Sequence, residues 1–265
     1  MIPGVVASHA TKIVFQNDGV TWVTQTSNFG NTTINYIAYG NNLWVAGGGI
    51  GQLRTSTDTI NWVTQTSNFG NTQIRFIAYA NNLWVAGGDR GQLRTSTDAV
   101  TWVTQNSNFG NTIIYSIAYA NNLWVAGGGI GRIRTSTDAV TWVTRNPGFG
   151  NATIFSVAYG DGLWVAGGGI GQLITSTDTI TWVTQTSNFG DTNIRSIAYG
   201  NNLWVAGGQI GQLRTSTDAV TWTTQNSNFG NTNILSVAYA DSLWVAGGYR
   251  GQLRTSISKS KKQLY

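Results

Sequence analysis

Residues 83–88 read Leu-Trp-Val-Ala-Gly-Gly, and the same six residues begin again at Leu43, Leu123, Leu163, Leu203 and Leu243. A second tryptophan recurs at Trp22, Trp62, Trp102, Trp142, Trp182 and Trp222. Both series advance by 40 residues without an insertion. A spacing this regular requires each unit to occupy the same geometric environment, so the sequence predicts a tandem array of one structural unit.

Each unit contains four short segments with strand character. In the second copy they are residues 74–79, 83–86, 92–96 and 101–105, and they are rich in β-branched and aromatic side chains. Asn, Gly, Thr and Asp separate them at residues 81–82, 87–91 and 97–100, as turns require. No segment is long enough or suitably periodic for an amphipathic helix. The fold class is therefore predicted to be all-β.

Four antiparallel strands in 40 residues are typical of one β-propeller blade. A single sheet cannot bury both of its faces, whereas blades arranged around an axis bury them against their neighbours. The two tryptophans of each unit are predicted to supply the large apolar groups between blades. These structural positions are Trp22, Trp44, Trp62, Trp84, Trp102, Trp124, Trp142, Trp164, Trp182, Trp204, Trp222 and Trp244. A phenylalanine in each inter-blade loop, such as Phe69, is predicted to be a buried plug of the same kind.

The predicted architecture is a six-bladed β-propeller of four-stranded antiparallel blades, formed as a single domain by residues 1–256. Its repeats start near residues 33, 73, 113, 153, 193 and 233. The last repeat supplies three strands, and the segment 11–26 around Trp22 is expected to add the fourth and close the ring. One strand is then left over, so a seven-bladed ring with two incomplete blades is the alternative. Residues 257–265 form a basic C-terminal tail.

Composition excludes several classes of protein. The chain has no cysteine, hence no disulfide or thiolate metal site, and no apolar run approaches the 18 residues of a membrane span. The N-terminus lacks the basic and apolar regions of a signal peptide. The net charge is +5, but three of the fifteen basic residues lie in the last seven positions, so nucleic acid is not an expected partner. Localisation stays open, with an extracellular or virion surface compatible with a charged fraction of only 9%.

The turn between the third and fourth strands reads Ser-Thr-Asp-Thr-Ile-Asn-Trp at residues 56–62 and recurs in related form in the other copies. Aspartate in such a turn accepts hydrogen bonds from backbone N–H groups. The aspartates expected in this role are Asp18, Asp58, Asp98, Asp138, Asp178 and Asp218. The pattern resembles the Asp-box, the sialidase-type or BNR-like repeat, over nearly the whole chain. The resemblance implies a propeller blade with a structural motif remote from catalysis. Only Asp18 is followed by the family's glycine, so the other turns are expected to differ in detail.

No catalytic constellation is recognisable. Sialidase-like chemistry would need an arginine cluster, a tyrosine nucleophile and acids, yet the chain has no glutamate. The four aspartates outside the turns, Asp89, Asp161, Asp191 and Asp241, are scattered over different repeats, and His9 has no evident partner. No cluster of His, Cys or acidic residues suits a metal. We therefore expect no enzyme, no cofactor and no metal.

A near-ring of arginines recurs in the third strands, at Arg54, Arg94, Arg134, Arg214 and Arg254, interrupted by Ile174. These side chains could bind an anion on the axis. Alternatively they bridge blades through backbone carbonyls and cover the tryptophans with their aliphatic stems, which is the interpretation we favour.

The copies differ mainly at two places, which the antiparallel topology brings to one face of the disc around the channel mouth. The first is the start of the first strand, with Asn35, Arg75, Tyr115, Phe155, Arg195 and Leu235. The second is the turn between the second and third strands, where Asp89, Arg90, Gln209, Tyr249 and Arg250 depart from the Gly-Ile of other copies. These residues are the candidate binding face, with neutral drift as the competing explanation.

Two functions remain. A non-enzymatic binding or structural propeller would present the diversified face to a protein partner. A multivalent lectin would bind glycans in near-identical pockets, which suits the aromatic richness and low charge. No aromatic and amide constellation recurs on an evidently exposed surface, so the first function is preferred. Oligomeric state is not determined.

Overall fold

The turns of each repeat follow directly from their sequence. Asn81 and Asn82 both adopt positive φ angles, 50° and 57°, which is the type I′ geometry that joins two strands into a tight hairpin. After the second strand, a glycine-rich turn ends at Gly91, whose φ is +64°. A Cβ on Gly88 would lie 2.0 Å from the Gln73 carbonyl oxygen, so that position accepts only glycine. Gly87 and Gly88 belong to the strand, and the turn itself is shorter than the sequence predicted.

The computed structural model describes residues 24–256. The strands are β1 (Ile34–Gly40), β2 (Leu43–Gly48), β3 (Leu53–Ser56), β4 (Val63–Gln65), β5 (Ile74–Ala80), β6 (Leu83–Gly88), β7 (Leu93–Ser96), β8 (Val103–Gln105), β9 (Ile114–Ala120), β10 (Leu123–Gly128), β11 (Ile133–Ser136), β12 (Val143–Arg145), β13 (Ile154–Gly160), β14 (Leu163–Gly168), β15 (Leu173–Ser176), β16 (Val183–Gln185), β17 (Ile194–Gly200), β18 (Leu203–Gly208), β19 (Leu213–Ser216), β20 (Thr223–Gln225), β21 (Ile234–Ala240), β22 (Leu243–Gly248) and β23 (Leu253–Thr255). Short 3₁₀ turns are η1 (Gly49–Gly51), η2 (Asp89–Gly91), η3 (Gly169–Gly171), η4 (Gln209–Gly211) and η5 (Tyr249–Gly251). None of these helical turns in residues 24–256 is long and apolar enough to span a membrane.

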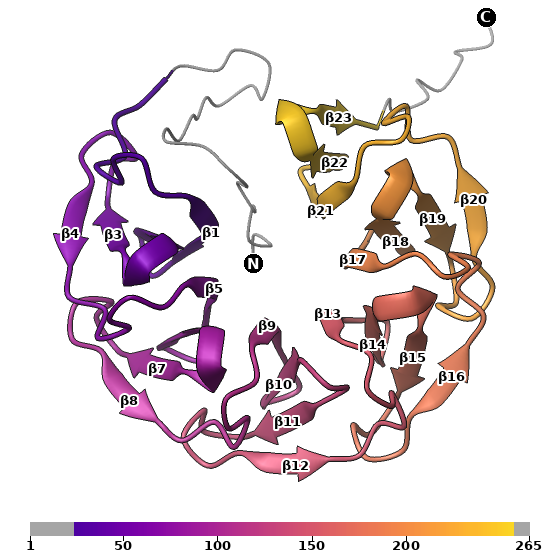
Figure 1. Ribbon diagram of the computed structural model, residues 1–265, viewed down its shortest axis with the longest axis horizontal. Coiled ribbons are helices and arrows are strands. Elements are labelled where there is room, and N and C mark those ends of the chain that lie inside the picture. Colours follow the sequence, from indigo (N-terminus) through magenta and orange to yellow (C-terminus); the bar gives the residue numbers. More distant parts are fainter. Residues whose placement is uncertain (1–23, 257–265) are drawn as a thin grey trace, which may run out of the picture.

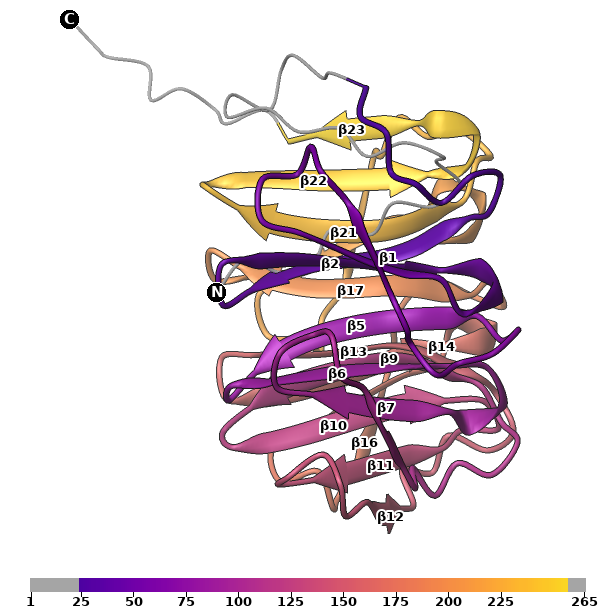
Figure 2. The same cartoon turned by 90° about the vertical axis from the view of Figure 1, so that its left-hand side faces the viewer.

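The strands form six antiparallel sheets arranged as the blades of a propeller (Figure 1). Five blades have four strands in sequential order from the axis outward, and the sixth has three, β21, β22 and β23. The first strands β1, β5, β9, β13, β17 and β21 lie innermost and contact one another in that order. In the edge-on view of Figure 2 the strands run across the disc from one face to the other. The predicted all-β six-bladed propeller is confirmed.

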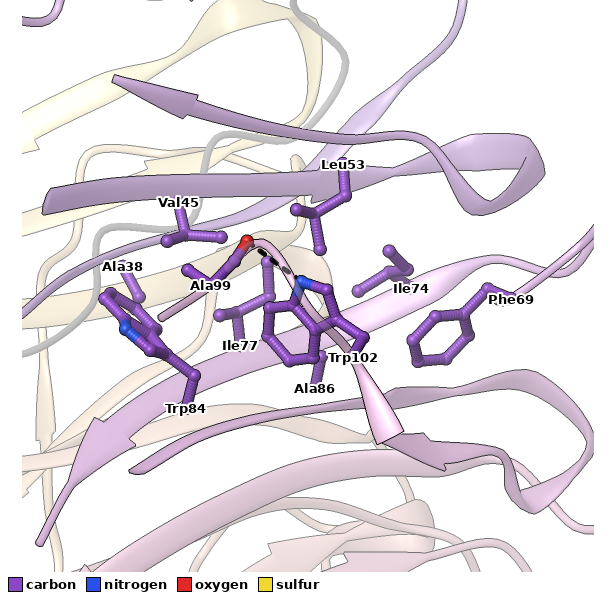
Figure 3. Close-up of a cluster of buried hydrophobic side chains, with 10 residues drawn as sticks. All are labelled: Ala38, Val45, Leu53, Phe69, Ile74, Ile77, Trp84, Ala86, Ala99 and Trp102. Atoms are coloured by element: carbon purple, nitrogen blue, oxygen red, sulfur yellow. Dashed lines mark hydrogen bonds between the residues drawn. The ribbon is translucent and has the colours of Figure 1, made fainter. Parts of the chain in front are cut away.

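The five interfaces between consecutive blades of residues 24–256 are filled by apolar side chains. Between the first two blades, Trp84 and Trp102 of the second blade pack with Val45 and Leu53 of the first (Figure 3). The loop residue Phe69 completes the same cluster, and all five side chains are buried. The indole Nε1 of Trp102 donates to the Ala99 carbonyl oxygen at 3.0 Å, so the ring's polar atom is satisfied within the core. Phe29, Phe109, Phe149, Phe189 and Phe229 are likewise buried plugs.

The Ser-x-Asp turns behave as expected for their aspartates. The Asp98 Oδ1 accepts hydrogen bonds from the backbone N–H groups of Val100 and Thr101 at 2.8 and 2.7 Å. Ser96 adds a third bond of 2.8 Å to the same oxygen. These bonds lower the pKa of Asp98 to about 2, because they stabilise the ionised carboxylate. Equivalent backbone bonds occur at Asp58, Asp138, Asp178 and Asp218.

The residues that replace the family's glycine after these aspartates keep a glycine-like conformation. Thr59, Ala99, Ala139, Thr179 and Ala219 all have φ between 59° and 65°. Their carbonyl oxygens accept the indole hydrogen bonds of the following tryptophans, which holds the turn in the left-handed region. The Asp18 turn, which has the family's glycine, lies outside the described residues, so the expected difference in detail between it and these five turns stays a prediction.

The sixth blade differs from the others at its outer side. Within residues 24–256, β23 pairs with β22 alone. Figure 1 shows a wider separation between this blade and β1–β4 than between any other neighbouring blades. The expected fourth strand draws on residues 11–26, of which only 24–26 are described, and these three form no strand. Trp22, Asp18, the extra strands of the seven-bladed alternative and the basic tail 257–265 lie outside the described residues.

Candidate functional site

The six innermost strands enclose a central channel with a cavity of about 440 Å³. The channel runs between the two faces of the disc. One end lies beside η1 to η5 and the inter-blade loops, because β1 begins at Ile34 opposite Gly48, next to the turn that follows β2. We call this end the mouth, and it contains the positions at which the repeats differ.

Five of the six diversified first-strand residues line the channel. They are Arg75, Tyr115, Phe155, Arg195 and Leu235. The sixth, Asn35, is not among the lining residues and has a structural contact instead: its side-chain amide donates to the Ile74 carbonyl oxygen of the next blade at 2.9 Å. The sequence could not separate this inter-blade link from the positions that face the cavity.

Four of the lining residues form one continuous arc across successive blades. The Arg75 guanidinium carbon lies 6.0 Å from the Tyr115 ring centre, and Tyr115 meets Phe155 edge to face at 5.1 Å. The Arg195 guanidinium then lies 4.3 Å from the centre of the Phe155 ring. Cation–π and edge-to-face contacts both favour this order. The result is an aromatic pair with an arginine at each end, here called the arginine–aromatic arc.

The two arginines of the arc have different electrostatic surroundings. The Arg75 Nε donates to the Asp89 Oδ1 at 2.8 Å, an ion pair with both side chains partly exposed. No such pair is found for Arg195 among residues 24–256, and its Nε is buried without a hydrogen-bond partner. An unpaired buried donor on a charged group is unfavourable by roughly 1–3 kcal/mol or more. Arg195 is therefore a cation that lacks an acceptor.

The turn residues of the candidate face surround the mouth in an unusual backbone conformation. Arg90 and Arg250 have φ of 55° and 58°, and the corresponding residues of the other copies are Ile50, Ile130, Ile170 and Ile210, also with positive φ. A β-branched residue rarely adopts this left-handed conformation. All four isoleucines are exposed, as is Tyr249. The mouth is thus bordered by apolar and cationic side chains on strained turns.

Two of the diversified positions have structural roles. The Gln209 Oε1 accepts from the Asn193 backbone N–H at 2.9 Å, and the Asn193 Oδ1 accepts from Ile170 N–H of the preceding blade at 3.1 Å. Asn233 makes the same bond to Ile210 at 3.0 Å. The diversified residue Gln209 therefore bonds within its own blade, whereas Asn193 and Asn233 link neighbouring blades. Asp89 similarly serves to orient Arg75.

In every described blade except the second, the residue after the diversified first-strand position also faces the channel, which the repeat pattern did not predict. In the third to fifth blades it is a serine, and the oxygens of Ser116, Ser156 and Ser196 accept backbone N–H bonds from the next blade at 3.0–3.1 Å. In the first blade it is Tyr36, whose burial raises the pKa of its hydroxyl. In the second it is Phe76, which is fully buried. The change from an aromatic residue to serine at this repeat position was the sequence signal that could have identified it.

At the opposite end of the channel the repeats agree. A tyrosine from each blade packs on a tryptophan of the same blade, as Tyr79 does on Trp84 with ring centres 4.7 Å apart. Its other side meets the preceding blade, since a Cβ on Gly40 would lie within 2.2 Å of the Tyr79 ring. Both faces of the Tyr79 ring are therefore covered, whereas Tyr39 of the first blade is 37% exposed.

The third-strand arginines also make structural contacts, as we favoured, but their aromatic partner is a phenylalanine and not a tryptophan. Arg94 donates to the Leu93 and Asn68 carbonyl oxygens at 3.0 and 2.7 Å. Its guanidinium lies 4.9 Å from the ring centre of the plug residue Phe69. The aromatic partner is thus the loop phenylalanine, and the bonds tie the entering loop to its own blade. Arg54, Arg134, Arg214 and Arg254 repeat these contacts. None of the five lines the channel.

Acidic and metal-ligating groups are sparse. Among residues 24–256, no three His, Cys, Asp or Glu side chains come together as a metal site would require. Asp89 is bonded to Arg75 at the mouth, and Asp161 and Asp241 lie in left-handed turns at the opposite face. No described pair of carboxylates faces the cavity.

No known family model matches the chain, and no curated protein matches it in sequence. Several solved structures share its fold. YCF48 bound to a D1 peptide has a TM-score of 0.78 at 15% identity, covering 96% of this chain and 87% of that one. YCF48 from Cyanidioschyzon merolae has 0.74 at 16%, covering 94% and 89%, and a computationally designed protein, Ika8, has 0.66 at 15%, covering 84% and 70%. At these identities the likeness extends to the propeller fold.

Proposed function

We propose that this chain is a non-enzymatic binding propeller that takes up a protein partner, through an extended segment of it, at the mouth of the channel. The observation that carries the proposal is the arginine–aromatic arc. Its Arg195 lies on a half-buried aromatic pair and has no hydrogen-bond acceptor among residues 24–256. The Nε atoms of Arg54 and Arg94 are also buried without a partner, but the terminal nitrogens of these two arginines are bonded to backbone carbonyl oxygens. Aromatic and arginine side chains in a concave site are the groups that most often anchor a protein ligand.

The surroundings of the arc suit a macromolecular partner. Exposed isoleucines on strained turns border the mouth, and such strain persists chiefly where function retains it. The YCF48 structure with a D1 peptide is a propeller of similar fold with a bound peptide, which makes a peptide ligand a reasonable choice for this chain. The Ser-x-Asp turns further support a relationship to Asp-box propellers, in which this motif is structural.

A lectin is the second candidate, and the structure offers less support for it. Glycan recognition in near-identical pockets would need a repeated aromatic face open to solvent. Tyr79 is covered by a tryptophan on one side and by the preceding blade on the other, and Tyr199 and Tyr239 repeat this arrangement. The unique arc supplies one site, which removes the multivalency on which weak sugar binding depends.

The proposal is tested by selecting peptides from a random display library on the immobilised chain, with a glycan array probed in parallel. The mouth variant carries Tyr115→Asn, Phe155→Asn and Arg195→Asn, which install the residue that the first repeat has at Asn35. The control variant carries Val103→Thr, Val143→Thr and Val183→Thr on the outer strands, which install the residue of the fifth repeat at Thr223.

We expect peptides to be retained by the native chain and the control variant and lost from the mouth variant. Peptide retention that is equal on all three proteins would contradict the proposal. Glycan binding that free monosaccharide abolishes, in the absence of peptide binding, would favour the lectin.

A further inference from the structure

We infer that the segment bound at the mouth is acidic, with two carboxylates no more than about four residues apart on either side of an apolar residue. This inference rests on the proposed function and adds the chemistry of the ligand. It starts from Arg195. A carboxylate is the group that satisfies a guanidinium best, since two parallel N–H···O bonds can form. Within residues 24–256, no acid is placed to do so.

The second anchor is Arg75 at the other end of the arc. Its Nε is used by Asp89, and the described residues offer no acceptor for its two terminal NH₂ groups. The ion pair therefore fixes the side chain and leaves the outer edge of the guanidinium free for a ligand oxygen. Asp89 is one acid beside two arginines, so the arc as a whole retains a positive charge.

The other charges of this face have the same sign. Its turns and inter-blade loops carry two aspartates, Asp89 and Asp191, among residues 24–256. Beyond the arc they also carry Arg90, Arg132 and Arg250. Arg132 is held by the Phe109 carbonyl oxygen and the Thr112 hydroxyl, whereas Arg90 and Arg250 are exposed. A net positive face attracts an acidic segment and opposes a basic one.

The length of the arc limits the ligand. Successive contacts of 6.0, 5.1 and 4.3 Å place the two guanidinium carbons at most about 15 Å apart. An extended peptide spans about 3.3–3.6 Å per residue, so carboxylates separated by up to four residues reach both arginines. The side chain between them then contacts the parts of Tyr115 and Phe155 that border the cavity, and these favour an apolar group.

A peptide fits this surface better than a nucleic acid does. Base recognition without a fixed sequence needs open aromatic faces and a basic groove along the phosphates. Here Arg195 covers Phe155, and Tyr115 presents itself edge to face against the same ring. The border of exposed isoleucines adds apolar surface that a polyanion does not use.

The test uses three fluorescent peptides on one scaffold, with fluorescence anisotropy as the readout. Their sequences are Gly-Ser-Asp-Ser-Leu-Ser-Asp-Ser-Gly and the versions with asparagine or lysine in place of both aspartates. Each is titrated into the native chain, into Arg195→Asn and into Arg145→Gln. The last variant removes the same charge on an outer strand and installs the glutamine that the other copies carry. Thermal melting of each variant verifies that it is folded.

We expect the aspartate peptide to bind the native chain at least about tenfold more tightly than the asparagine peptide, because charged pairs that are partly desolvated have effects of this size. Arg195→Asn should remove most of that preference, and Arg145→Gln should leave it within about twofold. Raising the salt concentration should weaken the aspartate peptide selectively, since salt screens the attraction.

Three results would overturn the inference. The first is equal affinity of the aspartate and asparagine peptides, or no detectable binding of the aspartate peptide. The second is a preference that survives Arg195→Asn. The third is an RNA oligonucleotide that binds as tightly, with the same dependence on Arg195. If the aspartate peptide shows no preference but library peptides are still lost from the mouth variant, the inference of an acidic ligand is wrong while the proposed function stands.

Discussion

The inter-blade core and the channel mouth are built on the same six-fold repeat, yet they use it in opposite ways. In the core, the second to fifth copies place the same tryptophan in equivalent contacts, so Trp84, Trp124, Trp164 and Trp204 are all at most 2% exposed. At the mouth, the same backbone position holds asparagine, arginine, tyrosine, phenylalanine, arginine and leucine in turn. The comparison shows that the repeat determines the shared blade structure, and that the residues that differ between copies gather at one end of the channel axis.

This difference has a simple physical origin. A core side chain touches both its own blade and a neighbour, so any change must be matched in the packing of two blades. A side chain at the mouth touches its neighbours along one side and borders the cavity on the other. The arc of Arg75, Tyr115, Phe155 and Arg195 can therefore be unique without disturbing the blades behind it.

The largest effect is expected in the core. Trp124 is 1% exposed and packs between the second and third blades. Trp124→Ala should lower the free energy of unfolding by about 3–5 kcal/mol, because it removes a large apolar group and leaves a cavity. Urea denaturation measures this loss. Val103→Ala on an exposed outer strand is the control and should change the value by less than about 0.5 kcal/mol. Comparable losses in both variants would contradict the assignment of the core.

A smaller effect separates a complete blade from the sixth blade. Leu93 is fully buried, whereas the equivalent Leu253 is 46% exposed. Leu93→Ala should lower the free energy of unfolding by about 2–5 kcal/mol, and Leu253→Ala in a chain without residues 1–23 by less than about 1 kcal/mol, since less apolar surface of Leu253 is buried among residues 24–256.

The same pair of variants tests the closure of the ring. We retain the proposal that residues 11–26 add the outer strand of the sixth blade. If that segment or another chain covers the blade, Leu253→Ala should be as destabilising as Leu93→Ala. In a chain that lacks residues 1–23, Leu253→Ala should then lower the free energy of unfolding only slightly. A mild effect in the full chain, unchanged by the deletion, would contradict closure by this segment.

The Ser-x-Asp turns give a pH dependence of intermediate size. The folded-state pKa values of Asp98, Asp138 and Asp218 are lowered to about 2, below the usual value for aspartate. A depressed folded pKa stabilises the native state above the unfolded value of about 4, and this contribution is lost as the pH falls through about 2. The melting temperature should therefore fall between pH 4 and pH 2.

Variants of these turns identify the groups responsible. Asp98→Asn keeps an oxygen that can accept the Val100 and Thr101 N–H bonds but does not titrate. It should reduce the slope of melting temperature against pH in this range, and combining it with Asp138→Asn and Asp218→Asn should reduce the slope further. A slope unchanged in the triple variant would show that other groups control acid unfolding.

The architecture and most of the candidate site were accessible from the sequence, because identical spacing in six copies fixes each residue's environment. The blades, the buried tryptophans and the placement of Arg75, Tyr115, Phe155 and Arg195 at one channel end all follow from that symmetry. What broke the symmetry was harder to predict. All six first strands share a register shift at this position, and Asn35 differs because its amide donates to the Ile74 carbonyl oxygen of the next blade, a contact that the repeat pattern does not contain.

The same limit applies to electrostatics and backbone strain. The sequence shows two arginines in the first strands, but only distances reveal that Arg75 has an acid and Arg195 has none within residues 24–256. Likewise, a Gly-Ile-Gly turn gives no sign that the isoleucine adopts the left-handed conformation, since that residue type normally avoids it. Both features arise from neighbours that are remote in the chain.

The smallest expected effect on stability lies at the mouth and has the opposite sign. Ile170 has φ of 49° and is 58% exposed, so its side chain contributes little burial while its backbone is strained. Ile170→Asn should raise the free energy of unfolding by about 1 kcal/mol. Asparagine tolerates the left-handed conformation, whereas this conformation costs most other residues about 1–2 kcal/mol. Ile180 is equally exposed, at 61%, on the opposite face and is absent from the residues with positive φ. Ile180→Asn should therefore give no gain in stability, and an equal gain in both variants would attribute the effect to surface polarity.

If Ile170→Asn stabilises the chain and also weakens peptide retention, the strained isoleucine is kept for binding at the expense of stability. Such a trade-off would distinguish the mouth from the core, where the repeated residues serve stability alone.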